Sequence, residues 1–147
     1  MNIRPITPDD FENWLQLWKG YQTFYKTSID DKTTKITFDR FQDINEPIFC
    51  LVVENDAKEL VAFVHYIFHR STWTVGNYCY LQDLYVDPAQ RGTGLGRKLI
   101  EAVYAQVEQN DCSRVYWLTQ ENNHQARLLY DRVAEQSGFI QYRKLFK

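Results

Sequence analysis

Three glycines at alternate positions, Gly92, Gly94 and Gly96, form the most chemically suggestive stretch of the sequence. An aromatic and branched run from Tyr78 to Val86 precedes them and predicts a strand. From Leu95 onward, apolar residues recur with the four-residue spacing of a helix that buries one face. Because glycine has no Cβ, such a loop lets the backbone approach an anion, and the unpaired N–H groups of the next helix point at it. The stretch therefore predicts a phosphate-binding site.

Basic residues around the loop add positive charge where a pyrophosphate would lie: Arg91, Arg97 and Lys98. Two known phosphate loops are excluded. The pattern Gly-x-x-x-x-Gly-Lys-Ser/Thr is absent, and the dinucleotide pattern Gly-x-Gly-x-x-Gly fails because Arg97 stands where its third glycine belongs. Alternate glycines also occur in tight turns, so the loop by itself leaves both interpretations open.

A second motif downstream gives the loop a family context. Asn123 is followed seven residues later by Tyr130, and then by Gly138-Phe139. Together with Arg91-x-x-Gly94-x-Gly96 and the preceding Leu84-Tyr85-Val86-Asp87-Pro88, this order resembles the acetyl-CoA signature of the GNAT superfamily of N-acetyltransferases. The resemblance covers nearly half of the chain. Within the superfamily it is closest to the spermidine/spermine-type diamine acetyltransferases and related small-amine acetyltransferases.

The resemblance implies an α/β fold in which helices flank a mixed, largely antiparallel sheet. It implies that acetyl-CoA is the acyl donor and lies beside the central strand, where two strands splay and leave backbone groups unpaired. The pyrophosphate would lie on the glycine loop, and the pantetheine arm would pair with the end of the strand. The residues that the resemblance assigns to the donor are Leu84, Tyr85, Val86, Arg91, Gly92, Thr93, Gly94, Leu95, Gly96, Arg97, Asn123 and Tyr130.

The resemblance also gives Tyr130 a catalytic role, as the general acid that protonates the departing coenzyme A sulfur. A phenol suits this role because it stays protonated at neutral pH. A backbone N–H of Tyr85, or of a residue nearby, would polarise the thioester carbonyl. On the helical pattern alone, Tyr130 could instead be a packing residue whose hydroxyl finds a partner, and Asn123 could be a helix cap.

The general base is where the sequence departs from these relatives, which carry Glu-Asp where this chain has Gln82-Asp83. Glutamine has no titratable proton acceptor at neutral pH, so it cannot replace glutamate as a base. Asp83 is therefore the predicted base, and regular alternation places it on the opposite face from Gln82. His65, or a water chain ordered by Gln82 and Tyr80, is the alternative. The change also leaves open whether the acceptor is a polyamine.

Length and composition predict a single domain over residues 1–147. Hydrophobic residues make up 44% of the chain and aromatic residues 16%, which predicts a packed core. No apolar run approaches a membrane span and the N-terminus has no signal-peptide pattern, so we expect a cytoplasmic protein with no membrane partner. The cysteines, Cys50, Cys79 and Cys112, lack metal-ligand spacing; we expect reduced thiols and no metal site.

Charge is distributed unevenly along the chain. The net charge of −2 does not suggest a nucleic-acid partner. Residues 1–87 hold 8 basic and 13 acidic side chains, whereas residues 88–147 hold 9 basic and 6 acidic ones. If the basic half binds the phosphates, the acidic half would face the acceptor, which favours a cationic amine. Two ordinary solvated surfaces would give the same count.

Periodicity and turn residues predict the remaining elements. Thr7-Pro8 begins a helix whose aromatic stripe is mainly core, although Trp18, Tyr21 or Tyr25 could line an acceptor pocket. The other expected helices are 33–44, which would bury Ile36, Phe41 and Ile44, one ending near 110, and one capped by Asn122 or Asn123. The other expected strands are 2–6, 48–54, 60–68, 115–119 and 139–146.

These inferences predict an acetyl-CoA-dependent N-acetyltransferase that moves an acetyl group to a small cationic amine by direct attack in a ternary complex. A protein lysine or N-terminal acetyltransferase is the alternative enzyme. A non-catalytic acyl-CoA-binding module is the alternative from another class, which Gln82 favours and the pairing of Asn123 with Tyr130 disfavours. A homodimer could form through an exposed strand edge or the aromatic C-terminal strand.

Overall fold

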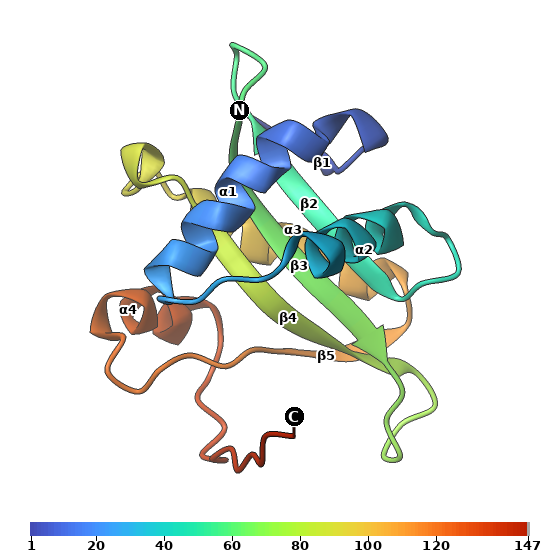
Figure 1. The fold of residues 1–147 in the computed structure, drawn as a ribbon. Coiled ribbons are helices and arrows are strands. Elements are labelled where there is room, and N and C mark those ends of the chain that lie inside the picture. Colours follow the sequence, from blue (N-terminus) through green and yellow to red (C-terminus); the bar gives the residue numbers. More distant parts are fainter. Residues whose placement is uncertain (147) are drawn as a thin grey trace.

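The computed structural model describes residues 1–146, which form one open, five-stranded sheet in the order β1-β2-β3-β4-β5 (Figure 1). The first four strands run antiparallel to their neighbours, and β5 runs parallel to β4. The expected mixed, largely antiparallel sheet is thus confirmed. The strands are β1 (Asn2–Pro5), β2 (Ile48–Glu54), β3 (Leu60–His69), β4 (Asn77–Val86) and β5 (Cys112–Tyr116).

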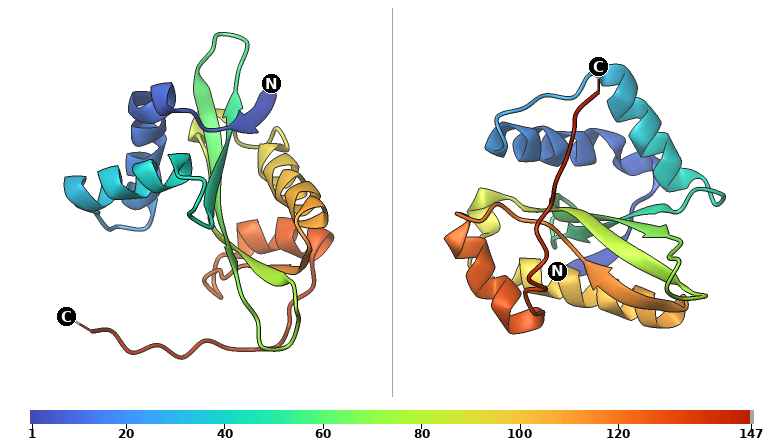
Figure 2. Two further views of the ribbon diagram at one scale, coloured as in Figure 1. Left: turned by 90° about the vertical axis from the view of Figure 1, so that its right-hand side faces the viewer. Right: turned by 90° about the horizontal axis from the view of Figure 1, so that it is seen from below.

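Helices cover both faces of the sheet (Figure 2). One face carries α1 (Phe11–Phe24), which follows a short 3-10 turn at Pro8–Asp10, and α2 (Asp31–Gln42). The opposite face carries α3 (Leu95–Gln109) and α4 (His124–Val133). We refer to these as the α1 face and the α3 face. Every helix that the sequence predicts is present.

The two faces bury different kinds of side chain. The core of the α3 face is mostly aliphatic and includes Leu81, Leu99 and Val103. The core of the α1 face is rich in aromatic rings, with Trp14, Trp18, Phe38 and Phe63 packed edge-on or stacked. Within the expected second helix, Phe41 packs against this core, but Ile36 and Ile44 are exposed, because the helix buries Thr34 and Phe38 instead.

The strand β4 contains a bulge at its centre. His65 pairs with Asp83 and Tyr66 pairs with Leu81, so Gln82 has no partner in β3. As a result, Leu81 lies in the core of the α3 face, whereas Asp83 contacts His65 on the α1 face. Two residues that regular alternation would place on one face therefore lie on opposite faces. The bulge thus breaks the regular alternation from which the expected placement of Asp83 relative to Gln82 was drawn.

The parallel pairing of β4 with β5 is short. Residues Asn77 to Tyr80 of β4 pair with β5, and the part of β4 from Leu81 to Val86 has no pairing on that side within the described chain. The strand expected at 115–119 begins and ends three residues earlier, since β5 spans Cys112–Tyr116. Beyond that point the chain turns away toward α4 and leaves one edge of β4 open (Figure 1).

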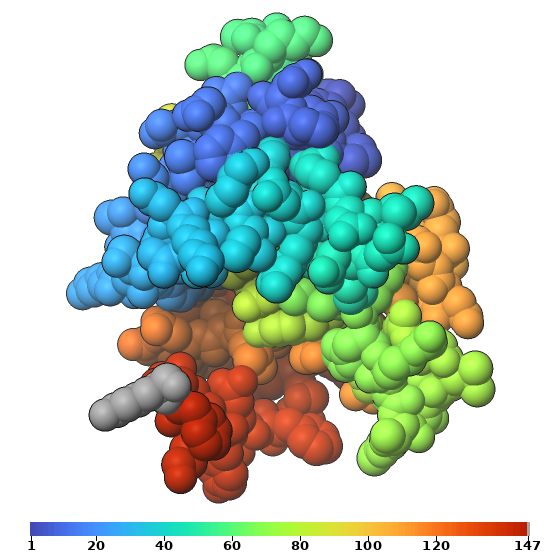
Figure 3. All heavy atoms as spheres, turned by 45° about the vertical axis from the view of Figure 1, so that its right-hand side comes forward, coloured from blue at the N-terminus to red at the C-terminus, as the bar shows by residue number. Residues whose placement is uncertain are grey.

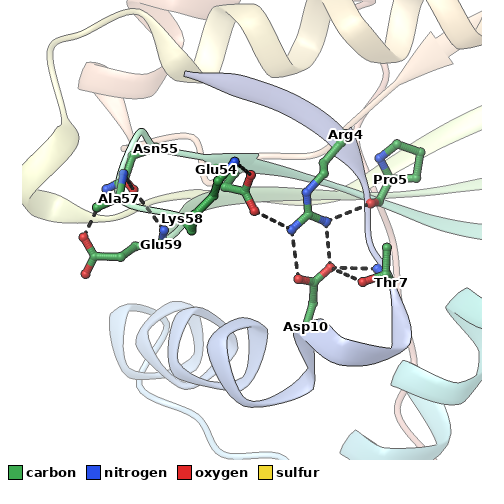
Figure 4. Close-up of polar contacts among 9 residues, drawn as sticks. All are labelled: Arg4, Pro5, Thr7, Asp10, Glu54, Asn55, Ala57, Lys58 and Glu59. Atoms are coloured by element: carbon green, nitrogen blue, oxygen red, sulfur yellow. Dashed lines mark hydrogen bonds and ion pairs between the residues drawn. The ribbon is translucent and has the colours of Figure 1, made fainter.

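An ion-pair network fixes the start of α1 to the sheet (Figure 4). The Arg4 guanidinium donates to both carboxylate oxygens of Asp10, at 2.8 and 3.0 Å, and to Glu54 at 2.9 Å. The Thr7 backbone N–H donates to Asp10 at 2.7 Å, as the sequence signal for a helix start requires. The network ties β1, β2 and the first turn before α1 together, and so sets where the aromatic stripe of α1 meets the sheet.

The C-terminal segment differs from its prediction. Residues 139–146 were expected to form a final strand, but residues 135–146 contain no helix or strand. This segment, the C-terminal arm, leaves α4 and extends past the sheet toward the side that α1 and α2 cover (Figure 2), and it protrudes from the body (Figure 3). A strand needs a hydrogen-bonding partner, and this segment pairs with none of the strands in the described chain.

Candidate active site

The glycine loop lies at the N-terminus of α3, directly after β4. Gly92 and Gly94 adopt left-handed backbone angles, with φ of 81° and 80°, and a Cβ at either position would meet nothing within 4 Å. Glycine is needed here for the backbone conformation rather than for space. Gly94 is the N-cap of α3, and no side chain caps the helix. The first amides of a 15-residue helix are therefore free to bind an anion.

The side chains predicted to help at this loop make contacts of their own. The Arg91 Nε donates to the Val86 carbonyl at 3.3 Å, and its guanidinium lies 5.8 Å from the Phe24 ring. Arg97 forms an exposed ion pair with Glu101 at 2.7 Å, and the Thr93 hydroxyl donates to the Gln90 carbonyl. The structure thus leaves the backbone amides, rather than these side chains, as the groups directed at a bound anion.

The register of β4 shows which backbone groups face the open edge. The Asp87 N–H donates to the Val61 carbonyl of β3 at 2.9 Å. Hydrogen-bonded and non-hydrogen-bonded pairs alternate in an antiparallel ladder, so the amide of Tyr85 points at β3. The amides and carbonyls of Leu84 and Val86 point away from β3, toward the open edge. The sequence suggested that the N–H of Tyr85, or of a residue nearby, polarises the thioester carbonyl. The Tyr85 N–H points at β3 and is used in the sheet, whereas the N–H of the neighbouring Leu84 faces the open edge.

Tyr130 and Asn123 both lie on the α4 side of this opening. The Tyr130 ring packs edge-on against Trp117 at 5.4 Å and against the same core as Leu84 and Val86. Burial and, to a smaller extent, the neighbouring Tyr25 raise the pKa of Tyr130, so its phenol stays protonated at neutral pH. Asn123 is the N-cap residue of α4, and its side-chain amide lies 3.4 Å from the Thr119 hydroxyl.

Asp83 and His65 form a close pair on the α1 face. The Nδ1 of His65 lies 2.9 Å from a carboxylate oxygen of Asp83, and the other ring nitrogen, Nε2, lies 3.1 Å from the indole nitrogen of Trp14. The His65 side chain is 3% exposed and that of Asp83 14%. The sequence suggested Asp83 and His65 as alternative bases. Their direct contact and the link to Trp14 were not predicted, because helical periodicity marks Trp14 only as a core residue.

Phenol rings surround the carboxylate of Asp83. Burial and the charge of Asp83 raise the pKa of Tyr21 and that of Tyr80. Tyr21 also contacts Tyr25 at 4.9 Å, and Tyr25 is the neighbour that influences Tyr130. Tyr21 and Tyr25, at the end of α1, therefore lie near enough to influence the electrostatics between Asp83 and Tyr130. Of the aromatic residues predicted as pocket candidates, Trp18 is instead a core residue, 6% exposed.

Other chemistries find little support in the described part of the chain. All three cysteines are free, and burial raises the pKa of the Cys79 thiol to about 12, so it is not a thiolate at neutral pH. Among residues 1–146, no cluster of three or more His, Cys, Asp or Glu side chains could hold a metal ion. No helix in those residues has both the length and the apolar character needed to cross a membrane.

The site thus combines an open strand edge, a glycine loop at a helix N-terminus and a protonated tyrosine opposite, which together could hold an anionic donor and supply a proton. The model of the "Acetyltransferase (GNAT) family" matches residues 11–134. The chain belongs to this family, and it is an acyltransferase.

Relatives of known name extend over nearly the whole chain. The D-amino-acid N-acetyltransferase HPA3 of Saccharomyces cerevisiae is 37% identical over 143 residues, covering 97% of this chain and 89% of that protein. The thialysine N-epsilon-acetyltransferase of Mus musculus is 33% identical over 156 residues, covering 96% and 90%. Among solved structures, a probable acetyltransferase superposes with a TM-score of 0.87 at 17% identity, covering 100% of this chain and 99% of that one.

Proposed function

We propose that the protein is an acetyl-CoA-dependent N-acetyltransferase that moves an acetyl group to a primary amine of a small cationic acceptor, by direct attack in a ternary complex. The observation that carries the proposal is the open edge of β4, which lies between the glycine loop and Tyr130 on the α3 face and reaches Asp83 on the α1 face. A donor and an acceptor could thus approach one point from opposite faces of the sheet.

The donor half of the proposal rests on backbone groups. The amides of residues 92–97 at the start of α3 would hold the pyrophosphate. The outward-facing N–H and C=O groups of Leu84 and the N–H of Val86 would pair with the pantetheine amides as an added strand would, whereas the Val86 carbonyl already accepts from Arg91. Asn123, at the start of α4, would bind the same arm from the other side. The residues fit the donor, since this edge presents unpaired groups that a closed sheet would have used.

The chemical steps fall to three groups. The acceptor nitrogen forms a bond to the thioester carbonyl carbon, and the N–H of Leu84 would stabilise the negative charge that develops on the carbonyl oxygen. Asp83 would first take one proton from the ammonium, which frees the nitrogen lone pair for this attack, and the second proton that the nitrogen loses after the new bond has formed would pass to water. The carbon–sulfur bond then breaks, and Tyr130 would give its phenolic proton to the sulfur. The tyrosine recovers a proton from water before the next turnover.

The acceptor half of the proposal rests on charge and aromatic surface. Asp83 supplies a carboxylate for an ammonium group, and the rings of Tyr21 and Tyr80 beside it suit the same cation. The two relatives described above are named for acceptors that are amino acids. The amine of a free amino acid or a short diamine is therefore the acceptor class that we propose, in preference to a lysine within a protein.

We further propose that the C-terminal arm docks on a second copy of this chain. Exposing several large apolar side chains to water is unfavourable for a lone chain. Those of the arm are between 76% and 91% exposed: Phe139, Ile140, Tyr142, Leu145 and Phe146. The outer edge of β5 has no strand partner in the described chain, so an arm from a second copy could extend the sheet there. Light scattering should find a dimer for the wild type and a monomer for the double variant Ile140→Asp, Tyr142→Asp. A monomeric wild type would contradict this part of the proposal.

The direct test of the enzymatic proposal is release of coenzyme A thiol from acetyl-CoA in the presence of a panel of amines. The panel would contain several D- and L-amino acids, S-aminoethyl-cysteine, spermidine, short diamines, an aminoglycoside and a lysine peptide. We expect turnover with at least one small amine, and a rate at least about tenfold lower for Tyr130→Phe, which keeps the ring but has no proton to give. Tight binding of acetyl-CoA with no turnover on any amine would instead indicate a binding module.

A further inference from the structure

We propose that His65 is a positioning residue for Asp83, held in one protonation form by the indole of Trp14, and that Asp83 and not His65 is the base. This inference rests on the function proposed above, since it assigns roles within the same site. The three side chains come from three elements, α1, β3 and β4, and form one chain of hydrogen bonds that ends at the acceptor side of the site.

The first link decides where the proton of His65 lies. An indole nitrogen only donates, so the Trp14 Nε1–H makes the Nε2 of His65, 3.1 Å away, the acceptor. A neutral imidazole that accepts at Nε2 carries its proton on Nδ1. The Nδ1–H therefore donates to Asp83 Oδ2 at 2.9 Å. Trp14 is fully buried, which keeps water away from this link.

The second link decides which group can take a proton from the acceptor. Both nitrogens of His65 are engaged and its ring is 3% exposed, so it has no free lone pair for an incoming amine. Asp83 is the more exposed partner and has the Tyr21 phenol beside it, and its second carboxylate oxygen, Oδ1, is not the one that faces His65. The acceptor ammonium can bind at that oxygen. One N–H bond of the ammonium breaks and an O–H bond forms on Asp83, which frees the nitrogen lone pair to form the carbon–nitrogen bond, and the carboxyl then returns the proton to water.

The surroundings of His65 explain why such a chain is needed. The β4 bulge turns Asp83 out of the regular alternation and onto the α1 face. Aromatic rings pack around the imidazole at 4.4 to 5.0 Å from Phe63, Phe41 and Trp18. In this apolar setting the buried His65 N–H is a fixed donor to the carboxylate, beside the Tyr21 phenol, so it holds the direction of Asp83 and stabilises its charge.

Two tryptophans of α1 provide a matched pair of variants. Trp14→Phe removes the indole N–H that binds His65. Trp18→Phe removes a neighbouring ring of the same size, stacked on Trp14 at 5.8 Å, whose indole N–H has no hydrogen-bond partner among residues 1–146. Both changes replace a buried indole on α1 with a smaller phenyl ring, but only Trp14→Phe removes the hydrogen bond to His65.

The first readout is the tautomer of His65, seen by ¹⁵N NMR of the full chain without substrate. We expect the Nδ1–H form at pH 7 in the wild type and in Trp18→Phe, and an added Nε2–H form in Trp14→Phe. The same tautomer mixture in all three proteins would overturn the inference. This readout does not depend on the protein being an enzyme.

The second readout is kinetic and uses the acceptor found in the thiol assay. His65→Leu should lower kcat about tenfold or more, a part of the roughly 10²- to 10⁴-fold that a general base contributes, with the KM for acetyl-CoA unchanged. His65→Asn, whose side-chain amide can donate to Asp83 in place of Nδ1, should recover most of this loss. Equal losses in the two variants, or an unaltered kcat in both, would overturn the inference while the proposed function stands. No turnover by the wild type with any amine would contradict both this inference and the proposed function.

Discussion

The two faces of the sheet differ in how their parts of the site are assembled. On the α3 face, the proposed donor-binding groups come from one continuous stretch, the end of β4, the glycine loop and the first turn of α3, joined by Asn123 and Tyr130 at the start of and within α4. On the α1 face, Trp14, His65 and Asp83 come from three elements that lie 51 and 18 residues apart in sequence. A local motif builds the donor side, whereas strand register and helix packing build the acceptor side.

This difference implies a division of labour that variants can test. Changes on the α3 face should alter the affinity for acetyl-CoA, and changes on the α1 face should alter the rate of proton removal from the acceptor. Two features of β4 allow both roles: the early end of β5 leaves an outward-facing edge for the proposed donor, and the bulge places the Asp83 carboxylate on the α1 face for the proposed acceptor.

The largest effect is expected for Asp83→Asn. An amide accepts no proton at neutral pH, so kcat should fall by roughly 10²- to 10⁴-fold, the usual contribution of a general base. Steady-state kinetics with both substrates varied would measure this, and the KM for acetyl-CoA should stay as in the wild type. A rate within a few-fold of the wild type would show that Asp83 is not the base.

A smaller effect is expected for Gly94→Ala on the α3 face. A side chain at a left-handed position costs about 1–2 kcal/mol, so the loop should shift and the KM for acetyl-CoA should rise about tenfold. Gly138→Ala is the matched control, because Gly138 also has a positive φ, of 84°, and an open Cβ position outside the loop. If both variants raise this KM equally, the loop is not the anion site.

The smallest effect on either substrate is expected for Arg4→Met, which acts on the support of α1. Loss of the charged hydrogen bonds to Asp10 and Glu54 should lower the free energy of unfolding by about 2 kcal/mol, measured by urea denaturation. Both substrate KM values should stay unchanged. Lys35→Met, which breaks an exposed pair with Asp39, is the control and should cost about 0.5 kcal/mol or less.

The same network predicts how stability depends on pH. Hydrogen bonds from Arg4 hold the pKa values of Asp10 and Glu54 below their ordinary values of 3.8 and 4.5. A carboxylate with a lowered pKa in the folded state stabilises the protein above its ordinary pKa, and this contribution is lost as the pH falls through the lowered value. The wild type should therefore lose more stability than Arg4→Met between about pH 5 and pH 2.

The sequence predicted those parts of the fold well that depend on residues close together in the chain. The strand 48–54 and the helix start at Thr7 are confirmed, because turn and capping residues fix them directly, and Asn123 takes the expected N-cap position of α4, although its side chain makes no capping hydrogen bond. The bulge opposite His65 and the bond between Trp14 and His65 were not predicted, because both depend on register between distant strands and helices. The C-terminal strand was predicted from alternation alone, and alternation does not supply the partner that a strand requires.

The most direct test of the division between the faces is isothermal titration of acetyl-CoA into the wild type, Asp83→Asn and Gly94→Ala, with no acceptor present. We expect Asp83→Asn to bind acetyl-CoA with the affinity of the wild type, and Gly94→Ala to bind about tenfold more weakly. Weakened binding by Asp83→Asn, with unchanged binding by Gly94→Ala, would place acetyl-CoA on the α1 face and contradict the proposed division between the two faces.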